Sequence, residues 1–409
     1  MTSNQTFVII GAGHAGGRAA QAMRAAGFEG RIVLIGEETY EPYERPPLSK
    51  ELLATDEGLE KARLHERAWY EEQKIELLTG NPAVKLDRDT GEIELADGAR
   101  LAYDKLLLTT GARVRELPVP GADLPGVHYL RTFDDSLAIR EGLKPSAKLV
   151  VIGGGFIGLE CAASACKRGC DVTVLEMADR LMGRAVAPEI GKHFEQLHRD
   201  NGVDLRLGVR ILGIEGAGKV ERVMLEGADP VPADMIVVGI GIVPNAELAA
   251  EAGIAVDNGI VVDKFGRTSD ENVFAAGDVA NQPNDFLGRR VRLESYQNAQ
   301  DQASAVARNM LGEAQAPYQD SLWVWSDQYE TNLQMLGQPD DYDRLVFRGD
   351  PQAGAFSVFY MQGLKLVAVN TVNAGRDMGA AKRLLASGKD FDAAALADPE
   401  VKLIKLAKG

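Results

Sequence analysis

One local pattern occurs twice in this chain and constrains its fold more than any other feature. In each copy a short apolar run is followed by a glycine-rich turn, a helical segment and a second apolar run. This order is typical of parallel strands joined by right-handed helical crossovers. The two copies lie 142 residues apart, far beyond the roughly 20–50 residues of a solenoid repeat. We therefore expect an α/β fold with two parallel-sheet domains. The turn glycines are Gly11, Gly13 and Gly16 in the first copy and Gly153, Gly155 and Gly158 in the second.

The spacing of these glycines is that of a dinucleotide-binding turn. The first glycine permits the tight turn, the second lets a pyrophosphate approach the backbone, and the third lets helix and strand pack closely. Glu37 and Glu176 end the second apolar run of each copy, where a carboxylate can accept hydrogen bonds from both ribose hydroxyls. The sequence therefore predicts two Rossmann-like dinucleotide-binding domains. A glycine-rich turn that binds nothing is the competing interpretation.

Two such sites on one chain suggest two different dinucleotides. We expect FAD at the first turn and NADH at the second, with hydride passing between them. The FAD assignment depends on Asn272–Asp278, an apolar strand ending in Gly-Asp that can place a carboxylate on the ribityl chain; an ordinary strand-end turn is the alternative. Glu176 favours NADH because it repels the 2′-phosphate of NADPH, although Arg180 and Arg184 follow closely.

Proline-rich crossings divide the chain. Residues 111–126 contain three prolines, and Pro244 marks a second crossing. After Pro317 the pattern changes to antiparallel strands, at 344–347, 355–361 and 364–369, followed by a helix at 378–386. We expect a discontinuous FAD-binding domain at 1–113 and 244–319, an NAD-binding domain at 114–243, and a small C-terminal α+β domain at 320–409.

Composition excludes several classes of protein. The chain has 45 Lys and Arg against 60 Asp and Glu, a net charge of −15, which argues against non-specific binding of nucleic acid. The apolar stretch 235–243 is too short for a membrane span, which needs about 20 residues. The N-terminus lacks a basic signal-peptide region, and the cysteine count is odd. We expect a cytoplasmic protein, a monomer or weak dimer, that binds neither nucleic acid nor membrane.

Several longer strings carry a family resemblance over essentially the whole chain. It resembles the pyridine-nucleotide–disulfide oxidoreductases and, within them, the FAD-dependent NADH:ferredoxin reductases of bacterial oxygenase systems. The strings are Arg45–Lys50, Leu108–Gly111, Gly153–Glu160, Gly239–Asn245, Ala275–Asp278 and Trp325–Tyr329. Of these, Arg45–Lys50 and Trp325–Tyr329 are far more specific than a glycine pattern. The resemblance implies a glutathione-reductase-like fold that passes electrons from NADH through FAD to a 2Fe–2S ferredoxin, which supplies a monooxygenase or dioxygenase.

The resemblance also implies roles for single residues. Lys50 would lie against the flavin near its hydride-accepting nitrogen, where a cation stabilises the reduced ring. Glu160 would pair with Lys50 at the nicotinamide position and keep it charged and oriented. Lys50 and Glu160 are thus the expected catalytic residues, and Trp325 would flank the isoalloxazine edge. The competing interpretations are a surface lysine, a helix-face charge and a core aromatic residue.

The remaining expected cofactor ligands fall into two sets. His14 either touches a flavin phosphate or caps its helix, and we favour the cap; Gly241 would let the nicotinamide half lie against the backbone. The FAD set is Gly11, Gly13, His14, Ala15, Gly16, Glu37, Arg45, Lys50, Thr110, Gly111, Arg113, Asp278, Ser295 and Trp325, and the NAD set is Gly153, Gly155, Ile157, Gly158, Glu176, Arg184 and Gly241. No metal site is predicted, since His193 and His198 are five residues apart.

The cysteines decide between electron acceptors. Cys161 and Cys166 are five residues apart on a predicted helix and point in different directions, so we interpret them, with Cys170, as ordinary helix or helix-end side chains and not as a redox pair. Electrons must then leave the flavin by a route other than a dithiol, and the resemblance implies that they leave one at a time to a 2Fe–2S ferredoxin. A rubredoxin reductase, an NADH oxidase, and a redox-sensing interaction protein like apoptosis-inducing factor remain alternatives.

An acidic ferredoxin would need a local basic patch for transient docking. The buried area would be small, as for redox encounters generally. Each candidate is individually more often a solvated surface charge. The candidates are Arg289, Arg290, Arg292, Arg308, Lys382 and Arg383.

Overall fold

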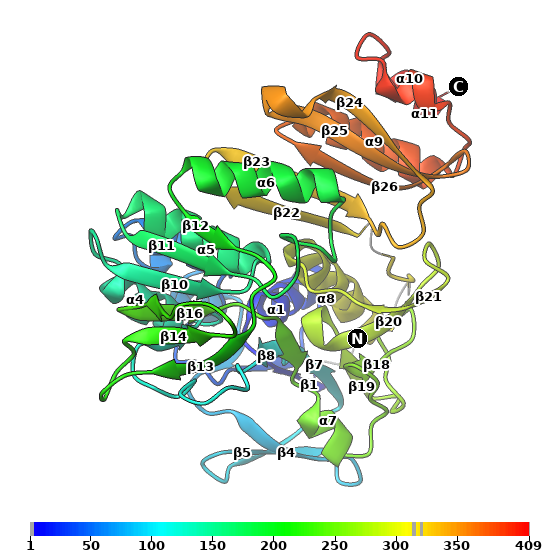
Figure 1. The fold of residues 1–409 in the computed structure, drawn as a ribbon. Helices are drawn as coiled ribbons and strands as arrows, with labels where there is room; N and C mark the ends of the chain where they lie inside the picture. Colours follow the sequence, from blue (N-terminus) through cyan, green and yellow to red (C-terminus); the bar gives the residue numbers. More distant parts are fainter. Residues whose placement is uncertain (1–3, 313–315, 320–321, 409) are drawn as a thin grey trace. The chain divides into compact units, whose positions relative to one another are not determined.

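The computed structural model (Figure 1) describes residues 4–312, 316–319 and 322–408. The chain divides into two compact units. Unit 1 comprises Met1–Pro46, Gly58–Arg113 and Ile242–Asp320, and unit 2 comprises Pro47–Glu57, Val114–Gly241 and Ser321–Gly409. The division into three domains stays a prediction, because the C-terminal residues share one unit with 114–241. No helix in the described part of the chain has both the length and the hydrophobicity needed to span a bilayer.

A five-stranded parallel sheet forms the centre of unit 1, in the order β19-β7-β1-β2-β3. Its central strands are almost fully buried, which is why they read as unbroken apolar runs. Helices α1 and α8 pack against each other beside it. The bounds are β1 Thr6–Ile10, β2 Arg31–Ile35, β3 Ile75–Leu78, β7 Lys105–Leu108, β19 Val273–Ala275, α1 His14–Ala25 and α8 Tyr296–Met310.

Smaller elements complete unit 1. Two three-stranded sheets, β4-β5-β6 and β18-β20-β21, lie outside the central sheet. Short helices connect the strands. The bounds are β4 Ala83–Asp87, β5 Glu92–Leu95, β6 Arg100–Ala102, β17 Ile242–Pro244, β18 Ile260–Val261, β20 Ala280–Asn284, β21 Arg289–Arg292, α3 Arg67–Glu72, α7 Glu247–Glu251, η2 Leu59–Lys61 and η3 Gly277–Val279, with β8 Ala112–Val114 at the end of the unit.

Unit 2 repeats the parallel design, with the strand order β12-β11-β10-β16-β9. A three-stranded antiparallel sheet, β13-β14-β15, is added to it. The bounds are β9 Val127–Tyr129, β10 Lys148–Ile152, β11 Asp171–Leu175, β12 Asp204–Arg206, β13 Ile211–Glu215, β14 Arg222–Leu225, β15 Val231–Pro232, β16 Met235–Val238, α4 Phe133–Gly142, α5 Phe156–Lys167 and α6 Pro188–Asp200.

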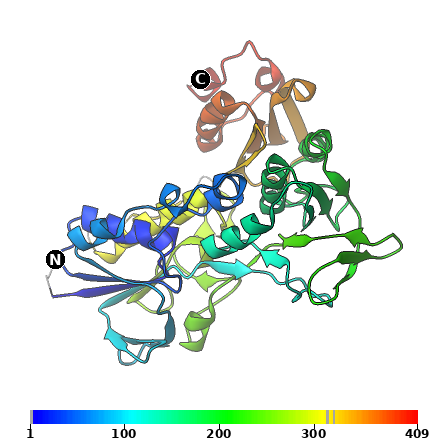
Figure 2. The same cartoon turned by 90° about the vertical axis from the view of Figure 1, so that its left-hand side faces the viewer.

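The C-terminal part of unit 2 is an antiparallel sheet in the order β22-β23-β26-β25-β24, with α9 packed against β26 and β23 (Figures 1 and 2). The predicted strands and helix are confirmed here. A shared apolar core joins this sheet to α5 and α6, so strand β22 lies against α5. The bounds are β22 Trp323–Gln328, β23 Thr331–Gly337, β24 Arg344–Asp350, η4 Pro351–Ala353, β25 Ala355–Gln362, β26 Lys365–Val372, α9 Gly375–Ser387, α10 Ala393–Ala397 and α11 Leu403–Lys408.

A short segment early in the sequence, 47–57, belongs to unit 2 although it falls within the predicted 1–113 domain. It contains part of η1 (Pro46–Ser49) and all of α2 (Glu51–Ala54). Side chains of α4 and α5, and Arg168 at the end of α5, hold its backbone carbonyls by hydrogen bonds. Ser136 donates to Leu48, Arg140 to Leu52 and Glu57, Ser164 to Ser49, and Arg168 to Leu53. This segment carries Lys50.

Candidate active site

The first glycine turn joins β1 to α1, and two of its glycines have no room for a side chain. Gly11 has φ +112°, and a Cβ there would lie under 3.0 Å from the carbonyl of Thr109. A Cβ on Gly16 would lie equally close to the carbonyl of Gly11. Gly13 differs, because the nearest atom to its notional Cβ is an Arg45 guanidinium nitrogen at 3.9 Å. The outer glycines therefore pack the turn, and the middle one leaves a bare backbone surface.

The second turn, between β10 and α5, has the same construction. Gly153 also has φ +112°, and its Cβ would press on the Gly239 carbonyl, while a Cβ on Gly158 would press on the carbonyl of Gly153. Apart from its chain neighbours, no atom of the residues that the structure describes lies within 4 Å of the notional Cβ of Gly155. In the described structure neither α1 nor α5 has a side-chain cap, and their N-caps are Gly13 and Gly155. Both turns thus fit a pyrophosphate held by backbone amides at a helix N-terminus.

The two predicted ribose carboxylates differ in their surroundings. Glu176 follows β11 and accepts hydrogen bonds from the amides of Gly154, at 2.6 Å, and Ala178, at 2.7 Å, so it lies directly at the second turn. Glu37 follows β2 and is exposed, whereas its neighbour Glu38 pairs with Arg45 at 2.9 Å. The carboxylate at the second turn is therefore held in place by the backbone.

The other residues predicted for the second turn are accessible. Ile157 is 46% exposed on the first turn of α5, which is unusual for so large an apolar side chain. Arg184 is exposed, and Gly241 has φ +106° with open space where a Cβ would lie. These positions offer contact surface, but their binding roles remain proposals.

In unit 1 the predicted cofactor residues occupy strand ends and helix starts. Thr110 donates to the Asn245 carbonyl at 2.6 Å, and Gly111 has φ +64°. Arg113 forms an ion pair with Glu247 at 2.7 Å. Asp278 lies in η3, Ala15 is buried in α1, and Ser295 caps α8 by accepting from the amide of Asn298 at 3.1 Å.

The prediction that His14 caps its helix is wrong. Gly13 is the N-cap, and His14 is the first helical residue. Its ring is buried, accepts a hydrogen bond from Arg18 at 3.4 Å and lies 4.3 Å from the Tyr296 ring. Burial, together with the charge of Arg18, lowers the pKa of His14 to about 3, so the imidazole is neutral.

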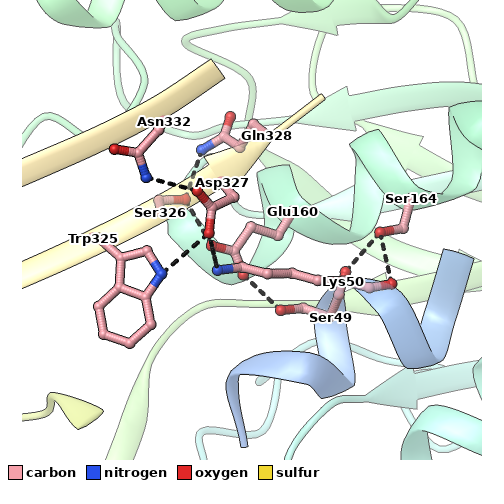
Figure 3. A network of polar contacts seen from close by, with 9 residues as sticks. All are labelled: Ser49, Lys50, Glu160, Ser164, Trp325, Ser326, Asp327, Gln328 and Asn332. Atoms are coloured by element: carbon pink, nitrogen blue, oxygen red, sulfur yellow. Dashed lines mark hydrogen bonds and ion pairs between the residues drawn. The ribbon is translucent and has the colours of Figure 1, made fainter. Parts of the chain in front are cut away.

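Lys50 is the centre of a polar cluster in unit 2 (Figure 3). Its Nζ lies 3.7 Å from Oε1 of Glu160 on α5, which confirms the predicted pairing, and 2.9 Å from Oδ2 of Asp327 on β22. The same nitrogen lies 5.4 Å from the centroid of the Trp325 ring. Two carboxylates and an aromatic face therefore fix one ammonium group.

Glu160 is only 4% exposed, and two hydroxyls compensate its burial. Ser49 donates to Oε2 at 2.5 Å, and Ser326 donates to Oε1 at 2.7 Å. Burial raises the pKa of Glu160, and the charge of Lys50 and the two hydroxyls oppose that rise. For the half-exposed Asp327, partial burial is outweighed by hydrogen bonds from Asn332 and Lys50, which lower its pKa.

The sequence reasoning missed Asp327, Ser326 and Ser49. All three lie inside the strings that carried the resemblance. Side chains alternate along a strand, so Trp325 and Asp327 share one face of β22 while Ser326 and Gln328 share the buried face. That alternation is the signal that would have found Ser326 and Asp327, whereas Ser49 lies in η1, outside this strand.

The cysteines have no redox arrangement. Cys161 and Cys166 lie in α5 and Cys170 just beyond it, as predicted, and all three are free. Burial raises the pKa of each thiol. Among the residues that the structure describes, no three His, Cys, Asp or Glu side chains form a group that could hold a metal ion.

The candidate docking cations are not equivalent. The side chain of Arg292 is 8% exposed and pairs with Glu294, and Arg290 donates to the carbonyl of Asn281. Lys382 lies 4.2 Å above the Trp323 ring. Arg292 is therefore a poor docking residue, whereas Lys382, Arg383, Arg289 and Arg308 are exposed.

Comparison with known proteins places this geometry among flavin and nicotinamide enzymes. Residues 5–303 match the family described as pyridine nucleotide-disulphide oxidoreductase, and residues 323–407 match the reductase C-terminal family. The chain is 45% identical over 403 residues to rhodocoxin reductase of Rhodococcus erythropolis, covering 98% of this chain and 94% of the relative. It is 44% identical over 402 residues to the ferredoxin–NAD(+) reductase component of the anthranilate 1,2-dioxygenase system of Burkholderia cepacia, covering 98% and 99%. The crystal structure of the covalent putidaredoxin reductase–putidaredoxin complex matches with a TM-score of 0.96 at 40% identity, over 100% of both chains.

Proposed function

The chain belongs to the pyridine nucleotide-disulphide oxidoreductase family, and from this premise we propose that it is an FAD-dependent NADH:ferredoxin reductase of an oxygenase system. The observation that carries the proposal is the Lys50 cluster, a partly buried ammonium held by Glu160 and Asp327. The names of the relatives support the acceptor, since the reductase of the anthranilate 1,2-dioxygenase system is a ferredoxin–NAD(+) reductase.

We assign FAD to the turn at Gly13 and NADH to the turn at Gly155. Each open glycine would admit a pyrophosphate to the backbone, and Glu176 would accept from the ribose hydroxyls while repelling a 2′-phosphate. When bound, FAD takes up two electrons as hydride and releases them one at a time. The other residues of the predicted FAD and NAD sets remain proposed cofactor ligands, as the family resemblance implies.

Lys50 and Glu160 are the proposed catalytic residues. The ammonium of Lys50 lies within ion-pair distance of two carboxylates, and it would stabilise negative charge on a reduced flavin. Glu160 orients that ammonium from the buried side, and Trp325 covers it with an aromatic face. Burial of Glu160 strengthens its interaction with Lys50.

The state of the three cysteine thiols supports the proposed electron acceptor. Three cysteines with raised pKa values and no disulfide give hydride no dithiol to reduce, which supports a one-electron acceptor such as a 2Fe–2S ferredoxin. Free thiols are also typical of a reducing compartment, which supports a cytoplasmic location. A monomer or weak dimer remains the prediction.

Steady-state turnover tests the proposal. The purified protein should carry a flavin spectrum and reduce cytochrome c only when a 2Fe–2S ferredoxin is added, faster with NADH than with NADPH. Equal turnover with rubredoxin, or rapid peroxide formation without any carrier, would instead support the alternative acceptors. Colourless protein that takes up no flavin would end the proposal.

A further inference from the structure

A row of buried polar groups continues from Glu160 into the interior of unit 2. Ser326, Gln328 and His198 are each 0% exposed. Gln328 Nε2 donates to Ser326 Oγ at 3.2 Å, as Figure 3 shows, and Gln328 Oε1 lies 2.9 Å from His198 Nε2. Burying three polar side chains costs free energy unless each is satisfied. Apolar packing alone therefore does not explain why these polar side chains are buried together.

Hydrogen-bond chemistry fixes the direction of this row. A carboxylate only accepts, so Ser326 must give its proton to Glu160 and its oxygen must accept from Gln328. The amide oxygen of Gln328 then faces His198, whose Nε2 must carry the proton. The neutral tautomer leaves Nδ1 of His198 as an acceptor, and burial lowers the pKa of His198, which favours that neutral form.

The far end of the row obeys the same rule. Tyr329 Oη lies 3.2 Å from His198 Nδ1 and 3.6 Å from the sulfur of Cys166. With Nδ1 as an acceptor, the hydroxyl of Tyr329 can give its single proton to His198 or to the sulfur of Cys166, and donation to His198 continues the row. From Tyr329 to Ser326 the donors then point toward Glu160, and hydrogen bonds aligned in one direction strengthen one another.

The backbone supports this reading at Tyr329. It has φ +55° in the two-residue turn between β22 and β23, a conformation that costs a residue with a side chain on the order of 1 kcal/mol or more. Its ring contacts His198 edge-on at 5.2 Å. The strained turn places the hydroxyl where the direction of the row requires a donor.

We propose that Gln328 and His198 are positioning residues that aim the hydroxyl of Ser326 at Glu160 and so hold the Glu160 carboxylate against Lys50. The proposal rests on the proposed function for its kinetic consequence alone. The groups that face Glu160 are Lys50, Asp327 and the hydroxyls of Ser49 and Ser326; those that face His198 are Gln328 and Tyr329, with Cys166 beyond.

Replacement of Gln328 and Ser326 tests the row. In Gln328→Met the hydroxyl of Ser326 loses its orienting donor, and in Ser326→Ala the last link is gone. Carboxyl vibrations of isotope-labelled glutamate, with Glu160→Gln as the subtraction reference, report the pKa of Glu160 without turnover. We expect each variant to raise this pKa by about one unit, since a hydrogen bond to the charged form is lost.

The double variant separates a relay from a local packing effect. Because both changes break the same row, Ser326→Ala combined with Gln328→Met should raise the pKa of Glu160 no further than Ser326→Ala alone. Additive shifts would overturn the proposal. Asn370→Leu removes an equally buried amide in the same sheet, bonded to Tyr360 and not to this row, and should leave the pKa unchanged.

Kinetics give the second readout. In stopped-flow reduction by NADH, Gln328→Met and His198→Asn should move the acid limb of the pH profile upward by about the same unit, with little change in the NADH concentration at half-maximal rate. Should Gln328→Met fail to fold, His198→Asn tests the same link. If the variants fold and the pKa of Glu160 does not shift, the proposed positioning role of Gln328 and His198 is refuted. If the pKa shifts but neither the wild type nor any variant shows flavin reduction by NADH, only the proposed function is refuted.

Discussion

Alanine at the second glycine turn separates binding from folding within four residues of sequence. Gly155 and Gly158 lie at the start of α5, yet an added methyl meets open space at Gly155 and a backbone carbonyl at Gly158. We expect Gly155→Ala to weaken NAD⁺ binding at nearly normal stability, and Gly158→Ala to destabilise unit 2. The contrast follows from sterics alone, because the chemical change is identical.

The magnitudes follow from those surroundings. At Gly158 the notional Cβ also lies 3.2 Å from Cγ1 of Val151, and the carbonyl of Gly153 moves only with the turn. We therefore place the cost at the upper end of overpacking, ~3 kcal/mol. At Gly155 the folding cost should stay below ~0.5 kcal/mol. A methyl over the phosphate surface there should remove one charge-assisted hydrogen bond, about 1.5–3 kcal/mol, or roughly 10- to 150-fold in Kd.

Calorimetric titration with NAD⁺ and urea unfolding of the FAD-loaded protein measure the two effects. Gly13→Ala is the matched control, since it sits in the equivalent open position of the first turn and should lower FAD retention while leaving the Kd for NAD⁺ unchanged. A Gly155→Ala protein that is stable and binds NAD⁺ like the wild type would refute the proposal that the backbone at Gly155 binds the pyrophosphate. A Gly158→Ala protein of unchanged stability would refute the steric argument.

Three further predictions address charge. Lys50→Met should slow flavin reduction by NADH by roughly 10²-fold while FAD content stays constant; an unchanged stopped-flow rate would remove Lys50 from the reaction. Glu176→Gln should raise kcat/KM for NADPH relative to NADH by about tenfold, because the repulsion of a 2′-phosphate is lost; an unaltered ratio would show that Glu176 does not select the coenzyme. The pKa of His14 is about 3 in the folded chain against about 6.5 when unfolded, so the unfolded state binds the proton first and stability falls as pH drops through this window, by up to ~1.4 kcal/mol per unit. His14→Gln should flatten that dependence in unfolding curves between pH 6.5 and 4, and a parallel decline in both proteins would contradict it.

The two glycine turns could be predicted from the sequence because the residues that specify each turn lie close together in the chain. A methyl group on Gly16 or Gly158 would meet the carbonyl of Gly11 or Gly153, which belongs to the same turn. The prediction for His14 was wrong for an equally local reason, because the helix begins at His14 itself and its N-cap is Gly13. Such errors of one position are inherent where a helix start is read from residue types.

The pairing of Lys50 with Glu160 was predicted from the resemblance and not from periodicity, and Asp327 was missed. Lys50 and Asp327 lie 277 residues apart, and no pattern within either segment specifies that they meet. The row from His198 to Glu160 was invisible for the same reason, since α6, β22 and α5 come together only through the apolar core that they share. Strand alternation could still have placed Ser326 and Gln328 on the inward face.

The hydrogen bonds from α4, α5 and Arg168 to the segment 47–57 have a consequence for protein engineering. A chimera that exchanges residues 114–241 with a relative would bring in a new glutamate and new anchoring side chains but keep the old lysine loop. The exchangeable module is therefore discontinuous, and hybrid reductases should retain activity only when the loop travels with the helices that grip it.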